Sequence, residues 1–171
     1  MEDPMIQQQA DLFRIRCALC IFMAGLILSG VTAFPLLHEI ELLGRLIGLA
    51  PQNSPPTCCG LQLWIANVRE ALRETNAHYP FLAYGTDWLA FGHLTIALFF
   101  VPALVNPFRH VANLWCGVAA CLGVIPLALI CGPIRGIPLY WRLIDCSFGV
   151  VGIIPLLYCI ALIRRASPPG R

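Results

Sequence analysis

Hydrophobic residues in this chain gather in four long stretches that contain no Asp, Glu, Lys or Arg. The stretches cover residues 17–37, 88–105, 111–134 and 146–163, and each is 18 residues or longer. An α-helix rises about 1.5 Å per residue, so a hydrocarbon core of ~30 Å needs about 20 residues to cross it. The pattern therefore predicts an all-α polytopic membrane protein, with four transmembrane helices over about residues 15–37, 88–105, 111–134 and 143–163.

Composition supports a membrane location independently of the pattern. The chain is 58% hydrophobic and 12% charged, with a mean hydropathy of +0.76, whereas an average soluble domain has roughly 25% charged residues. The formal net charge of +2 is spread in ones and twos along the chain, so no basic stripe is present to neutralise phosphates and nucleic acid is not an expected partner. The expected partner is the lipid bilayer, and membrane-protein partners or a second copy of the chain are left open.

The lengths of the connections predict how the four helices are ordered. Residues 106–110 and 135–142 form short connections, so the second, third and fourth helices are expected to be neighbours in an antiparallel four-helix bundle. The connection over residues 38–87 is long. We expect residues 1–171 to form a single integral membrane domain with this long loop at one end.

The distribution of arginine predicts the orientation. Four crossings place both termini on one side, which holds six arginines: Arg14, Arg16, Arg109, Arg164, Arg165 and Arg171. The other side holds five: Arg45, Arg69, Arg73, Arg135 and Arg142. Cytoplasmic segments carry an excess of Lys and Arg, so we expect cytoplasmic termini and an extracytoplasmic 38–87 loop. All basic residues are Arg and none is Lys, which is typical of GC-rich bacterial genomes and favours a bacterial inner membrane.

The N-terminus leaves a second interpretation open. Arg14 and Arg16 precede an apolar stretch that reaches Val31-Thr32-Ala33, the order found in a secretory signal with a small-residue cleavage site. The apolar stretch continues through Leu37 to a spanning length. This continuation favours a transmembrane helix over a cleaved signal.

The long loop contains two patterns of helical spacing. Apolar residues recur after Gly60, at Leu61, Trp64, Ile65, Val68 and Leu72, while the polar residues between them fall on the other side. The spacing predicts a short amphipathic helix that lies at the membrane surface or caps the bundle. An earlier apolar stripe lies opposite Glu41 and Arg45, which are expected to form an i,i+4 pair. Pro35 is expected to separate this segment from the first span.

The predicted topology collects polar and aromatic residues at the extracytoplasmic end of the bundle. The candidate site residues are Tyr84, Asp87, Trp88, His93, Arg135, Trp141, Arg142 and Asp145. His93 lies inside an apolar stretch, and ionisable residues in such positions almost always face the protein interior. His93 shares a helical face with Ala90, as Asp145 does with Gly149, and small residues mark close helix approach. We therefore expect His93 to be buried with a polar partner, near Asp145 or an arginine.

Three interpretations of this polar cluster remain open. Arg135 or Arg142 would bond to Asp87 or Asp145 in a structural ion-pair network, or the same groups would line a shallow ligand pocket. A less favoured alternative is that His93, with His38 or His78, ligates haem or a metal. The sequence has no HExxH motif, nucleophile elbow or phosphate loop, so it names no catalytic reaction and leaves the cofactor unknown. The leading prediction is a non-catalytic binding or accessory membrane protein.

The cysteines support an alternative function. Of nine cysteines, four are expected on the extracytoplasmic side, namely Cys58, Cys59, Cys131 and Cys146, although membrane cysteines commonly act as small apolar side chains. A four-helix membrane protein with loop cysteines beside an amphipathic helix resembles the thiol-oxidising quinone reductases related to vitamin K epoxide reductase and the disulfide-bond protein B family. The resemblance implies a membrane thiol oxidoreductase that relays electrons through these four cysteines. It covers architecture only, because those families place a C-x-x-C at the extracytoplasmic end, whereas Cys17-x-x-Cys20 lies at the opposite end.

Overall fold

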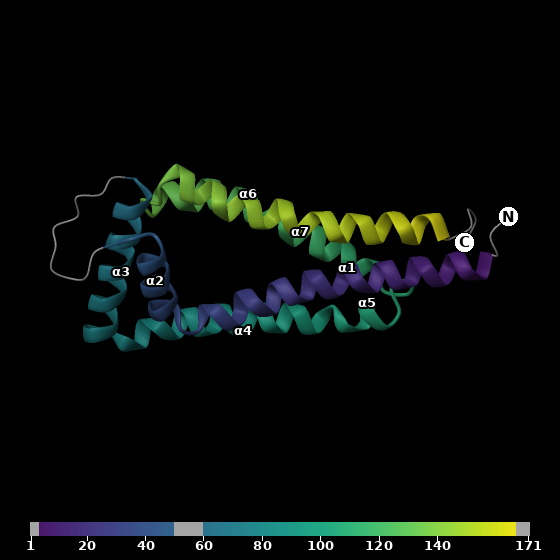
Figure 1. Cartoon of the computed structure of the whole chain (residues 1–171), viewed down its shortest axis with the longest axis horizontal. Coiled ribbons are helices and arrows are strands. Elements are labelled where there is room, and N and C mark those ends of the chain that lie inside the picture. The colour runs from purple at the N-terminus through teal and green to yellow at the C-terminus, as the bar shows by residue number, and fades with distance from the viewer. Residues whose placement is uncertain (1–3, 50–59, 167–171) are drawn as a thin grey trace. The chain divides into compact units, whose positions relative to one another are not determined.

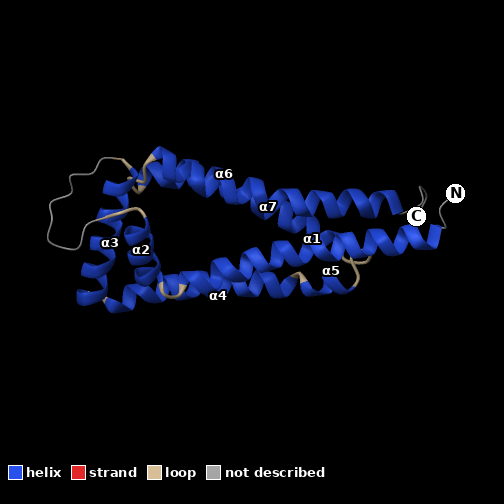
Figure 2. Cartoon of the chain, viewed as in Figure 1, coloured by secondary structure: helices blue, strands red, loops and turns tan. Residues whose placement is uncertain are grey.

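The computed structural model describes residues 4–49 and 60–166 (Figure 1). Within these ranges every regular element is a helix and none is a strand (Figure 2). In chain order the elements are α1 (Pro4–Ala33), α2 (Leu36–Leu46), α3 (Leu61–His78), the 3₁₀ helix η1 (Pro80–Ala83), α4 (Tyr84–Phe99), α5 (Val101–Val105), α6 (Val111–Ile134) and α7 (Leu139–Ala166).

Four segments of the described chain are long and apolar enough to cross a membrane. They are Met5–Ala33, Pro80–Val105, Val111–Ile134 and Leu139–Ala166. The predicted all-α fold with four transmembrane helices is confirmed, and the chain is an integral membrane protein. Residues 111–134 match the predicted third span from end to end. The first, second and fourth spans reach beyond the apolar stretches because a helix continues past the lipid wherever its backbone hydrogen bonds and packing persist.

Proline sets two of the helix boundaries. Pro35 lies at the turn between α1 and α2, as predicted, because it has no backbone N–H to donate to the preceding turn. In the second span, Pro102 leaves the carbonyl of Leu98 without a donor, and the helix is interrupted at Phe100 between α4 and α5. Pro126 and Pro155, by contrast, lie inside the continuous helices α6 and α7.

The chain divides into two compact units. We call residues 26–95 the hairpin unit, and residues 1–25 together with 96–171 the core unit. The hairpin unit contains α2, α3, η1, the end of α1 and most of α4, and the core unit contains the rest. The single domain over residues 1–171 stays a prediction, as does the antiparallel bundle as a whole.

The core unit is built on the antiparallel pair of α6 and α7. The Arg164 guanidinium lies 5.4 Å from the centre of the Trp115 ring, and a Cβ on Gly149 would come within 2.5 Å of the Cys121 carbonyl oxygen. The backbones of the two helices therefore approach each other directly at Gly149, the close approach that small residues allow in membranes. The buried cluster of this unit draws on α1, Phe100, α5, α6 and α7 and includes Ile15, Leu19, Phe100, Ala103, Leu114, Leu156 and Cys159.

The hairpin unit is held by contacts between α2 and α3. The Arg73 guanidinium donates two hydrogen bonds to Glu41 Oε1, at 3.0 and 2.6 Å, and the Gln62 amide donates to the Ile47 carbonyl at 2.9 Å. Ile65 on α3 is buried. The expected i,i+4 neighbour Arg45 acts on Glu41 through its charge, and the α2–α3 contact makes Arg73 the hydrogen-bonded partner of that carboxylate. A helix occupies the predicted amphipathic segment, and its position at an extracytoplasmic surface stays a prediction.

Candidate functional site

The predicted polar cluster is divided between the two units. Tyr84, Asp87, Trp88 and His93 belong to the hairpin unit, and Arg135, Trp141, Arg142 and Asp145 belong to the core unit. Each group is therefore described in its own unit. That the two groups together form one polar shell stays a prediction.

His93 finds its polar partner on its own helix. Its side chain is half-buried, and Nδ1 lies 2.8 Å from the Leu89 carbonyl oxygen one turn earlier on α4. A carbonyl only accepts, so Nδ1 carries the hydrogen and Nε2 is the nitrogen left for another partner. The Cβ of His93 would lie 3.2 Å from a Cβ placed on Gly30 of α1. Close packing against α1 therefore holds the Cβ of His93 in place.

The aromatic residues at the start of α4 are open to the surroundings. Tyr84 is 62% exposed and Trp88 is 58% exposed, and their rings meet edge to face at 6.0 Å. Trp and Tyr at the ends of a membrane span commonly lie at the level of the lipid headgroups. The exposure of this pair fits lipid contact. Asp87 lies in the first turn of α4, where the helix dipole favours a negative charge.

In the core unit, three of the predicted residues line one cavity where α6 ends and α7 begins. The cavity has a volume of about 220 Å³. Its lining consists of Val124, Leu127, Ala128, Cys131, Gly132, Arg135, Ile137 and Asp145. The candidate residues Cys131, Arg135 and Asp145 thus share one wall, and we call this cavity the turn pocket.

Arg142 approaches the turn pocket from α7. Its Cγ and Cδ pack directly on Gly132, leaving no room there for a Cβ, and its Nε is buried without a hydrogen-bond partner among the described residues. Within the same residues, Asp145 forms no ion pair with Arg135 or Arg142. Arg135 and Asp145 of the lining, and Arg142 beside it, therefore do not neutralise one another by direct contact.

The cysteine and metal alternatives are tested only within the described residues. Cys58 and Cys59 lie outside them. Cys131 is exposed, Cys146 is half-buried, and both are free thiols. No three His, Cys, Asp or Glu side chains in the described ranges gather as metal ligands. The four-cysteine relay stays a prediction.

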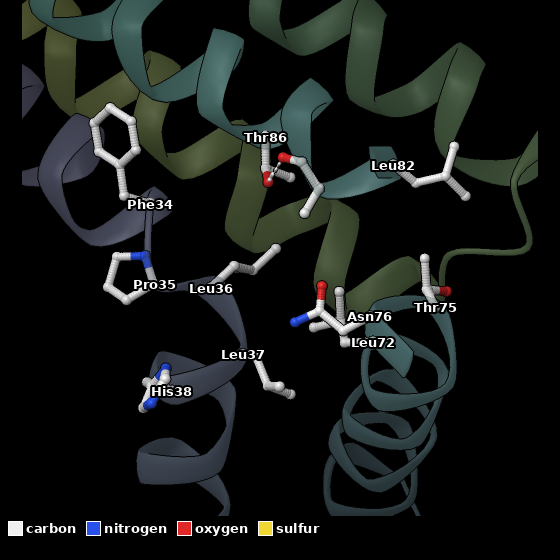
Figure 3. Close-up of a pocket in the computed structure, with 11 residues that line it drawn as sticks. Phe34, Pro35, Leu36, Leu37, His38, Leu72, Thr75, Asn76, Leu82 and Thr86 are labelled. Carbon is white, nitrogen blue, oxygen red and sulfur yellow. Dashed lines mark hydrogen bonds between the residues drawn. The ribbon is translucent and has the colours of Figure 1, made fainter. Parts of the chain in front are cut away.

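A larger cavity in the hairpin unit was not predicted. It has a volume of about 520 Å³, and we call it the interface pocket (Figure 3). Its lining residues come from the α1–α2 turn, α2, the end of α3, η1 and the start of α4: Phe34, Pro35, Leu36, Leu37, His38, Leu72, Thr75, Asn76, Leu82, Ala83 and Thr86. Two proline-containing turns, at Pro35 and Pro80, bring these helix ends together. Those prolines were the only signal of the pocket in the sequence.

Polar side chains at the α4–α5 break and at the end of α5 also make contacts that were not predicted. The Arg16 guanidinium donates to the carbonyls of Leu104 and Val105, at 3.3 and 3.1 Å. The Asn113 amide donates to the Phe99 carbonyl at 2.9 Å. These side chains satisfy backbone oxygens at the α4–α5 break and at the end of α5. Pro102, which causes the break, is a sequence signal from which they could have been predicted.

Comparisons with protein families, with curated proteins and with solved structures found no match for this chain. The fold defines its class as an integral membrane protein with four apolar helices. Any more specific function is argued from the two pockets and the residues that line them.

Proposed function

We propose that this chain is a non-catalytic binding or accessory protein of a bacterial inner membrane, with both termini in the cytoplasm. Its ligand site is the turn pocket of the core unit. The observation that carries the proposal is the buried, unpartnered Nε of Arg142 beside a cavity lined by Arg135 and Asp145.

The chemistry of the turn pocket favours a small ligand group with acceptor oxygens. A guanidinium offers planar pairs of donors that match a carboxylate or a phosphate. A buried donor without a partner costs about 1–3 kcal/mol, and a ligand oxygen at Arg142 Nε would remove that cost. The volume of about 220 Å³ is smaller than the ~300–1,000 Å³ of sites for drug-sized ligands. The bound group is therefore small.

Thermal unfolding of the full chain in phosphatidylcholine nanodiscs tests this proposal, with inorganic phosphate and acetate as probes. A ligand that binds the folded state raises the unfolding midpoint. We expect one of these anions to raise the midpoint of the parent, and Arg142→Gln to abolish the shift. Arg109→Gln is the matched control, because Arg109 is exposed and lies in the connection before α6. Equal shifts in both variants, or no shift in the parent, would contradict the proposal.

The second candidate is the thiol oxidoreductase, and one observation favours it: Cys131 is an exposed thiol on the wall of the turn pocket. Trapping of free thiols in intact membranes, followed by mass spectrometry, separates the two functions. The binding proposal predicts that Cys58, Cys59, Cys131 and Cys146 are all trapped as thiols. Disulfide exchange among these four, lost in Cys131→Ser, would favour the oxidoreductase.

A further inference from the structure

The interface pocket lies where two membrane spans meet the helices outside them. The first apolar segment ends at Ala33, and the pocket wall begins with the next residues, Phe34 and Pro35. The opposite wall includes Ala83 and belongs to the first turns of the span Pro80–Val105. The two spans touch within the same unit, because a Cβ on Gly30 would lie 2.9 Å from the Ala90 carbonyl oxygen. The pocket therefore lies at the depth where hydrocarbon gives way to headgroups.

The lining of this pocket is largely apolar, and its polar members are His38, Thr75, Asn76 and Thr86. Figure 3 shows Leu36 on α2 facing Leu72 and Asn76 on α3 across the space. No Arg, Asp or Glu belongs to the lining, and Arg73, one residue after Leu72, is hydrogen-bonded to Glu41. The Thr86 hydroxyl donates to the Ala83 carbonyl at 2.6 Å. A charged ligand would lack a counter-charge here, whereas a chain with neutral ester groups would be matched.

We propose that the interface pocket binds an acyl chain of a bilayer glycerophospholipid, with the ester region of that lipid at Thr75, Asn76 and His38. Its volume of about 520 Å³ is within the ~300–1,000 Å³ of small-ligand sites. A helix from a second copy of the chain is about 10–12 Å wide and rises about 5.4 Å per turn, so the pocket would hold roughly one turn of it. One turn is too short to anchor a second copy here. Lipid is the occupant that the position and the apolar walls favour.

Photo-crosslinking of the full chain in phosphatidylcholine vesicles tests the proposal. A small fraction of the phosphatidylcholine carries a diazirine in one acyl chain, and labelled peptides are identified by mass spectrometry after irradiation. We expect residues 34–38, 72–76 and 82–86 to be labelled about tenfold more than the exposed face of α4 around Leu89, which corresponds to ~1.4 kcal/mol of preference. Equal labelling of the pocket and the exposed face would mean that the pocket contacts lipid no more than any other lipid-facing surface does. That result would overturn the proposal.

Substitutions that fill or spare the pocket provide the second arm. Ala83→Trp places an indole in the cavity and is expected to remove the excess labelling of residues 34–38 and 72–76. Leu89→Trp adds the same ring at a position that is 57% exposed, and it should leave the excess unchanged. Excess labelling that persists in folded Ala83→Trp would contradict the proposal. If Ala83→Trp does not fold, the labelling pattern of the parent still decides.

Two further arms identify the source of the chain and separate this site from the turn pocket. A free fatty acid with the same diazirine should not label residues 34–38 more strongly than the phospholipid does; the reverse order would overturn the phospholipid source. Arg142→Gln lies in the core unit and should leave the labelling unchanged. Absence of anion binding in the parent, together with its excess lipid labelling at the interface pocket, would therefore contradict only the proposed function.

Discussion

At the scale of single residues, the pair Glu41 and Arg73 shows what a local pattern misses. Glu41 has Arg45 one turn away in its own helix, so the sequence favours that partner. In the structure Glu41 pairs with Arg73, 32 residues later, because the packing of α3 on α2 brings the guanidinium within 2.6 Å of the carboxylate. The partner of a surface carboxylate is decided by which helices meet, and spacing along one helix does not contain that information.

The Glu41–Arg73 pair leads to a prediction about pH. The hydrogen bond that Arg73 donates to Glu41 lowers the pKa of the Glu41 carboxyl below its ordinary value of 4.5. A lowered pKa means that the pair stabilises the fold above about pH 4.5 and that this stabilisation is lost as the pH falls through the lower, folded value. Glu41→Gln should therefore weaken the hydrogen-exchange protection of α2 at pH 7, and the difference from the parent should shrink below pH 4.5.

Glu70→Gln is the control for this prediction. Glu70 lies on the exposed side of α3 and forms no ion pair among the described residues. Its substitution should leave the protection of α2 unchanged at both pH values. A Glu41→Gln effect that is the same at pH 7 and well below pH 4.5 would show that the pair acts through packing and not through charge.

Asn113 carries a second prediction at this scale. Its amide donates to the Phe99 carbonyl at 2.9 Å, and interhelical hydrogen bonds in membranes contribute roughly 0.6–2 kcal/mol. Asn113→Leu should lower the free energy of unfolding by an amount in that range, measured as a lower thermal unfolding midpoint in detergent. Asn67→Leu, at an exposed position on α3, is the comparison. An unchanged midpoint in Asn113→Leu would mean that water satisfies the Phe99 carbonyl equally well.

At the scale of helices, hydropathy located the spans but not all of their ends. The stretch of residues 111–134 coincides with α6, because that helix is bounded by turns at both ends. α1 begins at Pro4, well before the predicted residue 15, and the buried Asp11 and Ile15 on its early turns explain the extension. Hydropathy measures transfer into lipid, whereas helix ends depend on packing and backbone hydrogen bonds.

The contact between α6 and α7 carries a prediction about glycine. A Cβ on Gly149 would lie 2.5 Å from the Cys121 carbonyl oxygen, and backbone cannot move aside as a flexible side chain can. Gly149→Ala should therefore separate α6 from α7 and destabilise the protein by about 1–3 kcal/mol. Gly123→Ala is the matched control, because a Cβ there meets nothing within 4 Å. Equal unfolding midpoints for the two variants in detergent would contradict the described register of α6 and α7.

At the scale of the whole molecule, the two pockets differ in how far sequence could predict them. Cys131, Arg135 and Asp145 flank a short connection between two antiparallel helices, so topology alone places them near one another, and they line the turn pocket. The interface pocket depends on the angles at which the chain turns at Pro35 and Pro80. A proline indicates that a helix stops, but it does not fix the direction that the next helix takes, so no pattern of residues predicted this cavity.

The orientation of the four spans is the prediction for the whole molecule. An even number of crossings places both termini on one side, and the six-to-five distribution of arginine favours the cytoplasm for that side. A reporter active only in the periplasm should be silent when fused after Arg171 and active when inserted between residues 50 and 59. The opposite result would reverse the orientation, and activity at both positions would mean that one apolar helix does not cross. Because each helix contributes one crossing, fusions after residues 79, 108 and 137 would then identify the helix that fails to span.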